Sequence, residues 1–277
     1  MPVVAMTREM GAGGTKVAQL VADQLGLMPI LHHLVEHDVA EHLHVRDEAV
    51  HHLFEGGATL LERLKVGSKR LAHYTAEEIL ELANRGNVLI RGWGACVILR
   101  DVPHVVRVRV CAPMEARERS VMERNPEIKD RSAARREIET NDAAHKRILH
   151  AAYGVEREDS TLYDLVLNTD RTSIETCAML ICELVERPEF RETEHSRAIL
   201  NDKAVLAHVN IKLRERFGVG TGVSGVEATA SGGKVTLTGI AIHSKLVEDA
   251  SKLVGEVSGV KEVQNRMVVV QGPRPLA

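Results

Sequence analysis

The chain of 277 residues is 44% hydrophobic and 27% charged, with a formal net charge of −3, and its length allows two domains that each bury a core. Neither this total nor the small basic excess of the last 80 residues is large enough to indicate nucleic-acid binding. The sequence has no apolar run of about 18 residues, no recognisable signal peptide and no disulfide-dense or CxxC cysteine spacing, so we expect a cytoplasmic protein without a membrane span.

Strands and helices alternate before residue 188. Apolar residues at 3–7 predict a strand, and helical spacing over 15–25 predicts a helix after a glycine-rich turn. Later strands are expected in the segments NVLIRG, HVVRVRVC and YDLVLNT. Further helices are expected from a TAEE capping box at 75–78, over 114–149 and up to Glu186. This alternation predicts an α/β fold with a parallel sheet covered by helices on both faces.

The loops that follow the strands predict where a ligand would bind. In a parallel α/β sheet, ligands bind beyond the carboxyl ends of the strands. We therefore expect three loops to meet at the site, the ones that follow Thr7, Arg91 and Val110.

The segment TREMGAGGTK at 7–16 has the form of a phosphate-binding loop with one charge displaced. Aligning Gly13 with the last glycine of the GxxxxGK[ST] motif places Arg8 at the first glycine. Gly14 then stands where the motif has its lysine, and Thr15 stands at the hydroxyl that binds magnesium. The glycines of the motif are therefore largely kept, while its lysine is missing.

Glycines between a strand and the N-terminus of a helix still favour an anion site. Arg8 or Lys16 would supply the missing positive charge. The dinucleotide motif GxGxxG does not fit, because it requires a glycine at Lys16. The remaining alternative is a tight turn that binds nothing.

Four segments in order resemble the cytidylate-kinase-like family of P-loop proteins: TREMGAGGTKVA (7–18), VLIRGWGACVILRD (88–101), VRVCAPMEARERSVMER (108–124) and YDLVLNTDR (163–171). The resemblance covers about residues 1–187. It implies a nucleoside-monophosphate-kinase-like fold that uses ATP with magnesium. The implied acceptor is a pyrimidine nucleotide such as CMP or dCMP.

The resemblance also implies roles for individual residues. The groups that would hold the ATP phosphates are Gly11, Ala12, Gly13, Gly14, Thr15 and Arg171, with Thr15 on the magnesium. The cations that would stabilise the transferred phosphoryl group are Arg8, Lys16, Arg117 and Arg124. The groups that would hold the acceptor are Arg91, Gly92, Trp93, Gly94 and Asp142. The alternative for the arginines between 117 and 147 is a solvated helix face paired with nearby acids.

Two positions depart from the family pattern. The family has GRG where this chain has GWG around Trp93, and an arginine three residues after an aspartate where this chain has His145 after Asp142. Trp93 either stacks on a base or covers the sheet. Arg91 points to the other side of an extended strand and is an imperfect substitute. Two functions stay open: an active kinase, or a catalytically impaired nucleotide-binding regulatory protein.

A histidine-rich segment, HHLVEHDVAEHLHV at 32–45, fits neither pattern. The HxxEH motif in this segment would place His33 and His37 on one helix face, as in inverted zincins. Zinc catalysis would need a third ligand and a general base. A surface or half-buried cluster of histidines over 32–52 is the favoured interpretation, and metal binding without catalysis stays open.

After Pro188 the pattern changes. A charged stretch at 188–199 is interpreted as a linker, with a surface helix as the alternative. Residues 200–271 then predict an α+β unit of order αββαβ, with a hairpin at Gly232–Gly233. Its segments GKVTLTG and GVKEVQNRMVV resemble the BON domain. The resemblance implies recognition of a protein partner, a lipid headgroup or an ion; a stabilising or dimerising role, with a homo-oligomer, is the alternative.

Overall fold

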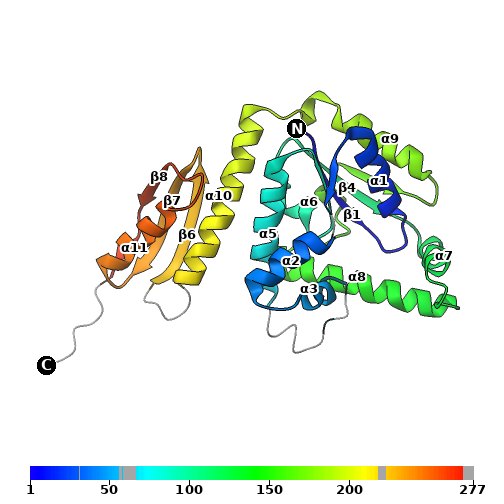
Figure 1. Ribbon diagram of the computed structural model, residues 1–277, viewed down its shortest axis with the longest axis horizontal. Helices are drawn as coiled ribbons and strands as arrows, with labels where there is room; N and C mark the ends of the chain where they lie inside the picture. The colour runs from blue at the N-terminus through cyan, green and yellow to red at the C-terminus, as the bar shows by residue number, and fades with distance from the viewer. Residues whose placement is uncertain (31, 56–57, 59–66, 218–222, 271–277) are drawn as a thin grey trace. The chain divides into compact units, whose positions relative to one another are not determined.

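The chain folds into two units, Met1–Thr193 and Glu194–Ala277. The computed structural model describes residues 1–30, 32–55, 58, 67–217 and 223–270 (Figure 1). Within these residues, no helix combines the length and the apolar character needed to cross a membrane.

Five strands of the first unit form one parallel sheet. Their order across the sheet is β2 (Met28–Ile30), β3 (Val88–Arg91), β1 (Val3–Arg8), β4 (Val105–Cys111) and β5 (Leu165–Asn168). In register, Val3 of β1 lies between Val88 of β3 and Val105 of β4. The sequence predicted every one of these strands except β2, whose three residues include a proline and are too few to display a period.

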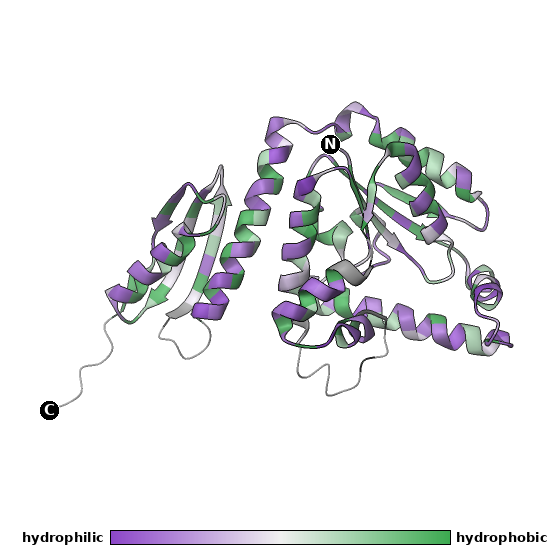
Figure 2. Ribbon diagram, viewed as in Figure 1, coloured by the Kyte–Doolittle hydropathy of each residue, from purple (hydrophilic) through white to green (hydrophobic). Residues whose placement is uncertain are grey.

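Helices cover both faces of this sheet, as predicted. Val4 and Met6 of β1 point to one face, where they pack with α1 (Gly14–Leu25) and α9 (Ile174–Val185). The opposite face is covered by α5 (Ser68–Arg85) and the short α6 (Ala95–Ile98). Figure 2 shows the result as hydrophobic strands between helices whose outer faces are hydrophilic. The alternation of side chains along β1 is what lets one strand serve both layers.

The predicted helix start at 75–78 is wrong. α5 begins at Ser68, after Gly67, so Thr75 lies inside the helix and does not cap it. Leu71 and Tyr74 are buried and continue the inward stripe of Ile79 backwards by one to two turns. Because the residues before the capping box are buried in the same stripe, the helix starts before Thr75 and continues through the capping-box sequence.

The helical stretch predicted over 114–149 consists of two helices, α7 (Met114–Arg124) and α8 (Arg131–Tyr153). Pro126 lies between them, and the side chain of Asp130 caps α8 by accepting from the backbone N–H of Ala133 at 2.8 Å.

An ion-paired carboxylate holds α7 against α8. Glu118 is 1% exposed and accepts from Arg131 Nε at 2.9 Å and Arg135 Nε at 2.6 Å. Burial would raise the pKa of Glu118, but these two arginines outweigh that effect and keep the pKa below its ordinary value. Arg131 and Arg135 of the arginine-rich stretch thus form ion pairs that join the two helices.

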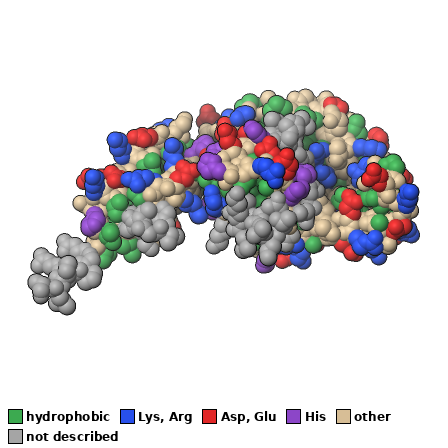
Figure 3. Space-filling view, turned by 60° about the horizontal axis from the view of Figure 1, so that its bottom comes forward, with side chains coloured by type: hydrophobic (Ala, Val, Ile, Leu, Met, Phe, Trp, Pro, Cys, Tyr) green, Lys and Arg blue, Asp and Glu red, His purple; other side chains and the backbone are tan. Residues whose placement is uncertain are grey.

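The described residues of the first unit also form α2 (His32–Leu43), α3 (Asp47–Glu55) and the short 3₁₀ turns η1 (Ser160–Leu162) and η2 (Pro188–Phe190). Figure 3 shows acidic and basic side chains interspersed on the face in view, without a basic patch.

The second unit has the predicted αββαβ order, with its last strand divided in two. Its elements are α10 (Glu194–Arg216), β6 (Val223–Ser231), β7 (Lys234–Ala241), α11 (Ser244–Gly255), β8 (Glu262–Asn265) and β9 (Val268–Val269). β6 and β7 form the predicted hairpin at Gly232–Gly233, and β8 and β9 both pair parallel with β7. Because α10 begins at Glu194, residues 194–199 of the expected linker are helical.

Side chains from both layers of the second unit form a core of its own. Val209 of α10, Leu237 of β7 and Val254 of α11 belong to it and are fully buried. Asp202 of α10 accepts from the N–H groups of Gly232 and Gly233 at 2.8 and 3.0 Å, which ties the hairpin turn to the helix.

Candidate active site

The glycine loop joins the carboxyl end of β1 to the N-terminus of α1. Gly11 and Gly13 have φ angles of 83° and 70°, in the left-handed region that favours glycine. A Cβ atom on Gly11 would also lie 2.7 Å from the carbonyl oxygen of Arg117. Gly13 is the N-cap, so the first N–H groups of α1 have no partner within the helix. The loop therefore presents the positive end of a helix dipole to an anion.

Arg8 occupies the space where a lysine side chain at position 14 would begin. A Cβ atom on Gly14 would lie 2.7 Å from Cβ of Arg8 and 3.5 Å from Cβ of Val110. A side chain at position 14 would therefore collide with the side chain of Arg8. Thr15 and Lys16 are exposed on the first turn of α1.

Arg117 supports the loop from behind. Its side chain is 5% exposed, and its Nε donates to the carbonyl oxygen of Met10 at 2.7 Å. Both terminal nitrogens donate to Asp142, at 2.8 and 2.9 Å. Burial would raise the pKa of Asp142, but the ion pairs with Arg117 and Arg157 hold that pKa below its ordinary value. Two predicted site residues, one for the phosphoryl group and one for the acceptor, therefore bind each other.

This pair belongs to a chain of five charged side chains under the loop. Arg109 Nη2 donates to Glu9 at 2.6 Å, Glu9 lies 3.6 Å from Arg117, and Asp142 lies 3.2 Å from Arg157. Three arginines and two carboxylates alternate along this chain, and the half-exposed Glu158 lies 3.9 Å from Arg157 Nε at its far end. The exposed fractions of the five side chains run from 4% to 23%, so these ion pairs are poorly solvated.

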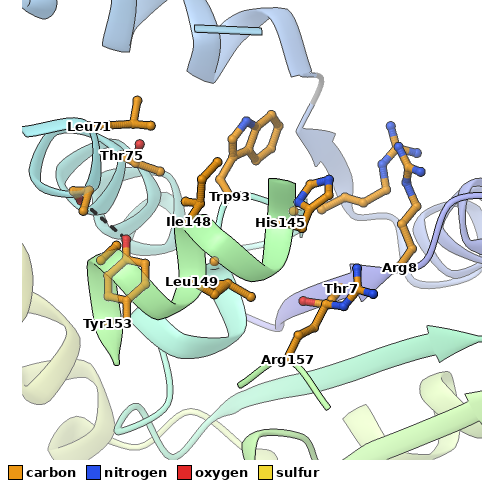
Figure 4. Close-up of a pocket in the computed structure, with 15 residues that line it drawn as sticks. Thr7, Arg8, Leu71, Thr75, Trp93, His145, Ile148, Leu149, Tyr153 and Arg157 are labelled. Atoms are coloured by element: carbon orange, nitrogen blue, oxygen red, sulfur yellow. Dashed lines mark hydrogen bonds between the residues drawn. The ribbon is translucent and has the colours of Figure 1, made fainter. Parts of the chain in front are cut away.

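A cavity opens beside the loop, between the carboxyl ends of β1 and β3 and the helices α5 and α8 (Figure 4). The basic residues of its lining are Arg8, Arg91, His145 and Arg157. The other lining residues are mainly apolar and include Leu71, Ala72, Trp93, Ile148, Leu149, Ala152 and Tyr153. Among the described residues that line it, none is acidic. The cavity thus suits a ligand with an anionic end and a planar or apolar end.

The GWG loop forms one wall of the cavity in an unusual backbone conformation. Gly92, Trp93 and Gly94 have φ angles of 96°, 49° and 75°, and a tryptophan in the left-handed region is rare. Trp93 is 4% exposed. Figure 4 shows its indole on the side of Leu71 and Ile148, apart from Arg8 and Arg157.

The expectation that Arg91 points to the opposite side is wrong. Arg91 and Trp93 line the same cavity, because the chain leaves the extended conformation at Gly92 and the alternation of a strand ends there. Arg91 is half-buried, its Nε has no hydrogen-bond partner among the described residues, and burial lowers its pKa.

The remaining predicted residues lie at different distances from the loop. Arg171 is exposed in the turn after β5, and the hydroxyl of Thr169 in that turn donates to the carbonyl oxygen of Ala12 at 2.9 Å. Arg124 is exposed at the end of α7, about 10 Å along the helix from Arg117. Its Nε donates to the carbonyl oxygen of Ser120. The structure thus brings Arg171 near the loop and leaves Arg124 outside the cavity lining.

Sequence reasoning missed Glu9 and Arg157. Glu9 lies within the glycine loop itself, and an acid at that place was a weak sign of a supporting ion pair. Arg157 lies in the charged stretch VEREDS, which has the composition of a solvated loop. Nothing local distinguishes it from its exposed neighbours.

Histidines of the region 32–52 form hydrogen bonds between α2 and α3. His37 lies 3.0 Å from Asp47, and His51 lies 3.2 Å from both carboxylate oxygens of Glu36. No three potential metal ligands gather among the described side chains. The side chain of His33 lies outside the described residues, so its predicted pairing with His37 stays a prediction.

Comparison with known proteins identifies the first unit. Residues 3–171 match the model of the cytidylate kinase-like family. The chain belongs to this family. A cytidylate kinase of Pyrobaculum calidifontis is 30% identical over 176 residues, which are 63% of this chain and 87% of that protein. One of Staphylothermus marinus is 28% identical over 107 residues, 39% of this chain and 59% of that protein, so that match spans less than two thirds of the relative.

The fold and the second unit have matches as well. A crystal structure of an uncharacterized protein from Eubacterium ventriosum superimposes with a TM-score of 0.52 at 19% identity, over 68% of this chain and all of that one. At that identity the likeness shows the fold alone. Residues 202–271 match the BON domain. The chain thus consists of a cytidylate kinase-like unit followed by a BON domain.

Proposed function

We propose that the first unit is a nucleotide kinase that transfers a phosphoryl group from ATP to a nucleoside monophosphate, with CMP or dCMP as the acceptor. The observation that carries this proposal is the cavity beside the glycine loop, whose lining combines basic residues with apolar ones. Family membership supports the reaction class, since relatives are named cytidylate kinases.

The glycine loop would hold the donor phosphates. Gly11, Gly13 and Gly14 leave space that side chains would fill, and the start of α1 adds unpaired N–H groups. Magnesium usually binds through substrate phosphates and few protein ligands, and the exposed Thr15 hydroxyl fits that limited role. Lys16 and Arg171 are exposed near the loop and would neutralise further phosphate charge.

The reaction itself asks for placement and positive charge. An oxygen of the acceptor phosphate would attack the γ-phosphorus while the bond to the β–γ bridging oxygen breaks, and ADP would leave. Arg8 lies between the loop and the cavity, so its charge would act where the γ-phosphoryl group passes. In this proposal Arg117 is a positioning residue, because its nitrogens are bound to Met10 and Asp142.

One observation favours the alternative of a regulatory nucleotide-binding protein. Trp93 gives the cavity wall an apolar side chain at the position where the family pattern has an arginine. ADP release should therefore be measured with ATP plus CMP, dCMP or UMP and compared with ATP alone, for the wild type and for Arg8→Met. The kinase proposal expects acceptor-dependent ADP release that Arg8→Met lowers by at least about tenfold. Saturable ATP binding without release for any acceptor would support the regulatory function.

We propose that the BON domain recognises a partner, which would be a protein, a lipid headgroup or an ion, in the cytoplasm. Its exposed apolar side chains gather around the pairing of β7 with β9: Ile240, Ile242, Val268, Val269 and Val270. Such residues suit a contact surface. Light scattering of the full chain with and without Val268→Glu tests the alternative of a homo-oligomer formed through this surface.

A further inference from the structure

Arg157 is a buried cation whose guanidinium is only partly used by the protein. Its side chain is 4% exposed, and its Nη2 lies 3.2 Å from Asp142. Its Nε is 3.9 Å from Glu158, beyond hydrogen-bond distance. Nε and Nη1 are buried without a hydrogen-bond partner among the described residues. Leaving donors of a charged group unpaired in the interior is costly, so a ligand that accepts from them would be strongly favoured.

The backbone of Arg157 is held in place. The phenol of Tyr163 donates to the carbonyl oxygen of Arg157 at 2.9 Å, and burial raises the pKa of Tyr163 to about 12. The bond to Asp142 fixes the other end of the side chain. Figure 4 shows Arg157 extending toward Thr7 at the carboxyl end of β1, inside the cavity. Its unpaired nitrogens are therefore preorganised toward a ligand.

The surrounding charges define the kind of ligand. Arg8 and Arg91 line the same cavity as Arg157. Among the described lining residues none is acidic. A dianion with several acceptor oxygens meets these donors better than a carboxylate, because an arginine fork binds two phosphate oxygens together.

We propose that Arg157, together with Arg91 of the same cavity, binds the phosphate of the acceptor, while the base of that acceptor lies against the apolar wall of Trp93 and Leu71. This inference rests on the proposed function for the identity of the acceptor. It assigns a specificity-determining residue that the motifs of the sequence do not contain. Discrimination between a nucleotide and its nucleoside then depends on Arg157.

Calorimetric titration of the full chain without ATP tests this assignment. The probes are CMP and cytidine, and the proteins are wild type, Arg157→Lys and Arg157→Met. Loss of hydrogen bonds to a charged group should weaken CMP binding by about 10- to 100-fold. Cytidine affinity, which involves no phosphate, should change by less than about threefold. ATP affinity should fall less than CMP affinity, because Arg157 is connected to the glycine loop only through Asp142 and Arg117.

Arg107→Met is the matched control. Arg107 is also an interior arginine, 19% exposed, and donates to Asp164 from Nε and Nη2, but it does not line the cavity. Its loss should lower thermal stability and leave CMP affinity unchanged. Arg157→Lys keeps a charge near Asp142, so it provides a folded variant if Arg157→Met is too unstable, as thermal melting will show.

The outcomes separate this inference from the proposed function. A folded Arg157→Lys protein that binds CMP as the wild type does overturns the inference, whether or not phosphoryl transfer occurs. Equal losses of CMP and cytidine affinity also overturn it, because they indicate a general distortion of the cavity. CMP binding that depends on Arg157 in a protein without phosphoryl transfer supports the inference and contradicts the proposed kinase reaction.

Discussion

Neighbouring glycines of the loop are required for different physical reasons. Gly13 combines a left-handed φ of 70° with a position where a Cβ atom would lie 2.8 Å from Cδ1 of Ile174. Gly14 has ordinary backbone geometry, and its restriction comes from the side chain of Arg8. The close approach of α9 and β1 to the loop therefore limits both positions.

Gly13→Ala should lower both stability and ATP affinity. The left-handed conformation costs an alanine roughly 1–2 kcal/mol, and the displaced Ile174 would move the loop N–H groups away from the phosphates. We expect ATP affinity to fall by about tenfold or more. Gly154→Ala is a matched control, since Gly154 has a φ of 66° and nothing within 4 Å of its Cβ position. Equal ATP affinity in the two variants would contradict a phosphate-binding role for the loop.

Trp93 is the only tryptophan in the sequence and lines the cavity, so its fluorescence should change saturably when CMP binds. Trp93→Arg would bury a charge beside Leu71 and Ile148, and we expect it to destabilise the first unit by at least about 2 kcal/mol. Trp93→Phe keeps an apolar ring and should retain most CMP affinity. Trp93→Arg could instead melt as the wild type does and bind CMP more tightly. That result would mean that Trp93 stands where an arginine would contact the phosphate.

At the scale of elements, carboxyl groups from two helices face each other. Glu78 of α5 lies by Asp38 of α2, and burial raises the pKa of Glu78 to about 7, with further contributions from Asp38 and Glu81. A folded-state pKa above the ordinary 4.5 means that the folded protein holds a proton which the unfolded chain has released. Stability from this contact is therefore complete below about pH 4.5 and is lost as the pH rises through 7.

Glu78→Gln should remove this pH dependence, because the amide donates to Asp38 at any pH. The variant should melt at a higher temperature than the wild type at pH 8 and at a similar temperature at pH 5. Glu137→Gln, at an exposed position of α8, serves as the control with no such difference. A wild type and a Glu78→Gln protein whose melting temperatures run parallel from pH 5 to 8 would exclude a raised pKa at Glu78.

At the scale of the whole molecule, each unit has a core built from its own residues. Leu89 of β3 belongs to the core under α1 and α9, while Leu237 of β7 belongs to the core under α10 and α11. Both side chains are at most 1% exposed. Separate cores allow one unit to lose stability while the other keeps its fold.

Leu237→Ala should therefore destabilise the BON domain alone, by about 2–5 kcal/mol for a large-to-small core change. The fluorescence of Trp93 reports only the first unit, since residues 194–277 contain no tryptophan, while calorimetry detects both units. We expect an unchanged fluorescence melt and an unchanged ATP affinity beside a lowered calorimetric transition. Leu89→Ala is the reciprocal variant and should lower the fluorescence melt. Equal shifts of both signals would mean that the units unfold together.

The sequence by itself determined the features that depend on local pattern. The strand at 3–7, the helix after the glycines and the hairpin at Gly232–Gly233 were predicted because their periodicity and turn residues are contiguous. The meeting of the loops after β1, β3 and β4 followed from a general property of parallel sheets. The loop from Gly11 to Thr15 was found in the same way, since the residues that shape it are adjacent.

Only the tertiary structure decided which charges face the cavity. Arg117 and Asp142 were predicted to bind different parts of the substrates, and no sequence feature indicated that they bind each other. Arg157 stands in the sequence among exposed charges of similar type. Thr75 was predicted to cap a helix, but it lies inside α5 because the packing of Leu71 extends the helix towards its N-terminus. The physical reason is common to all of these. Burial and ion pairing depend on contacts between residues distant in the chain, and a one-dimensional pattern does not contain those contacts.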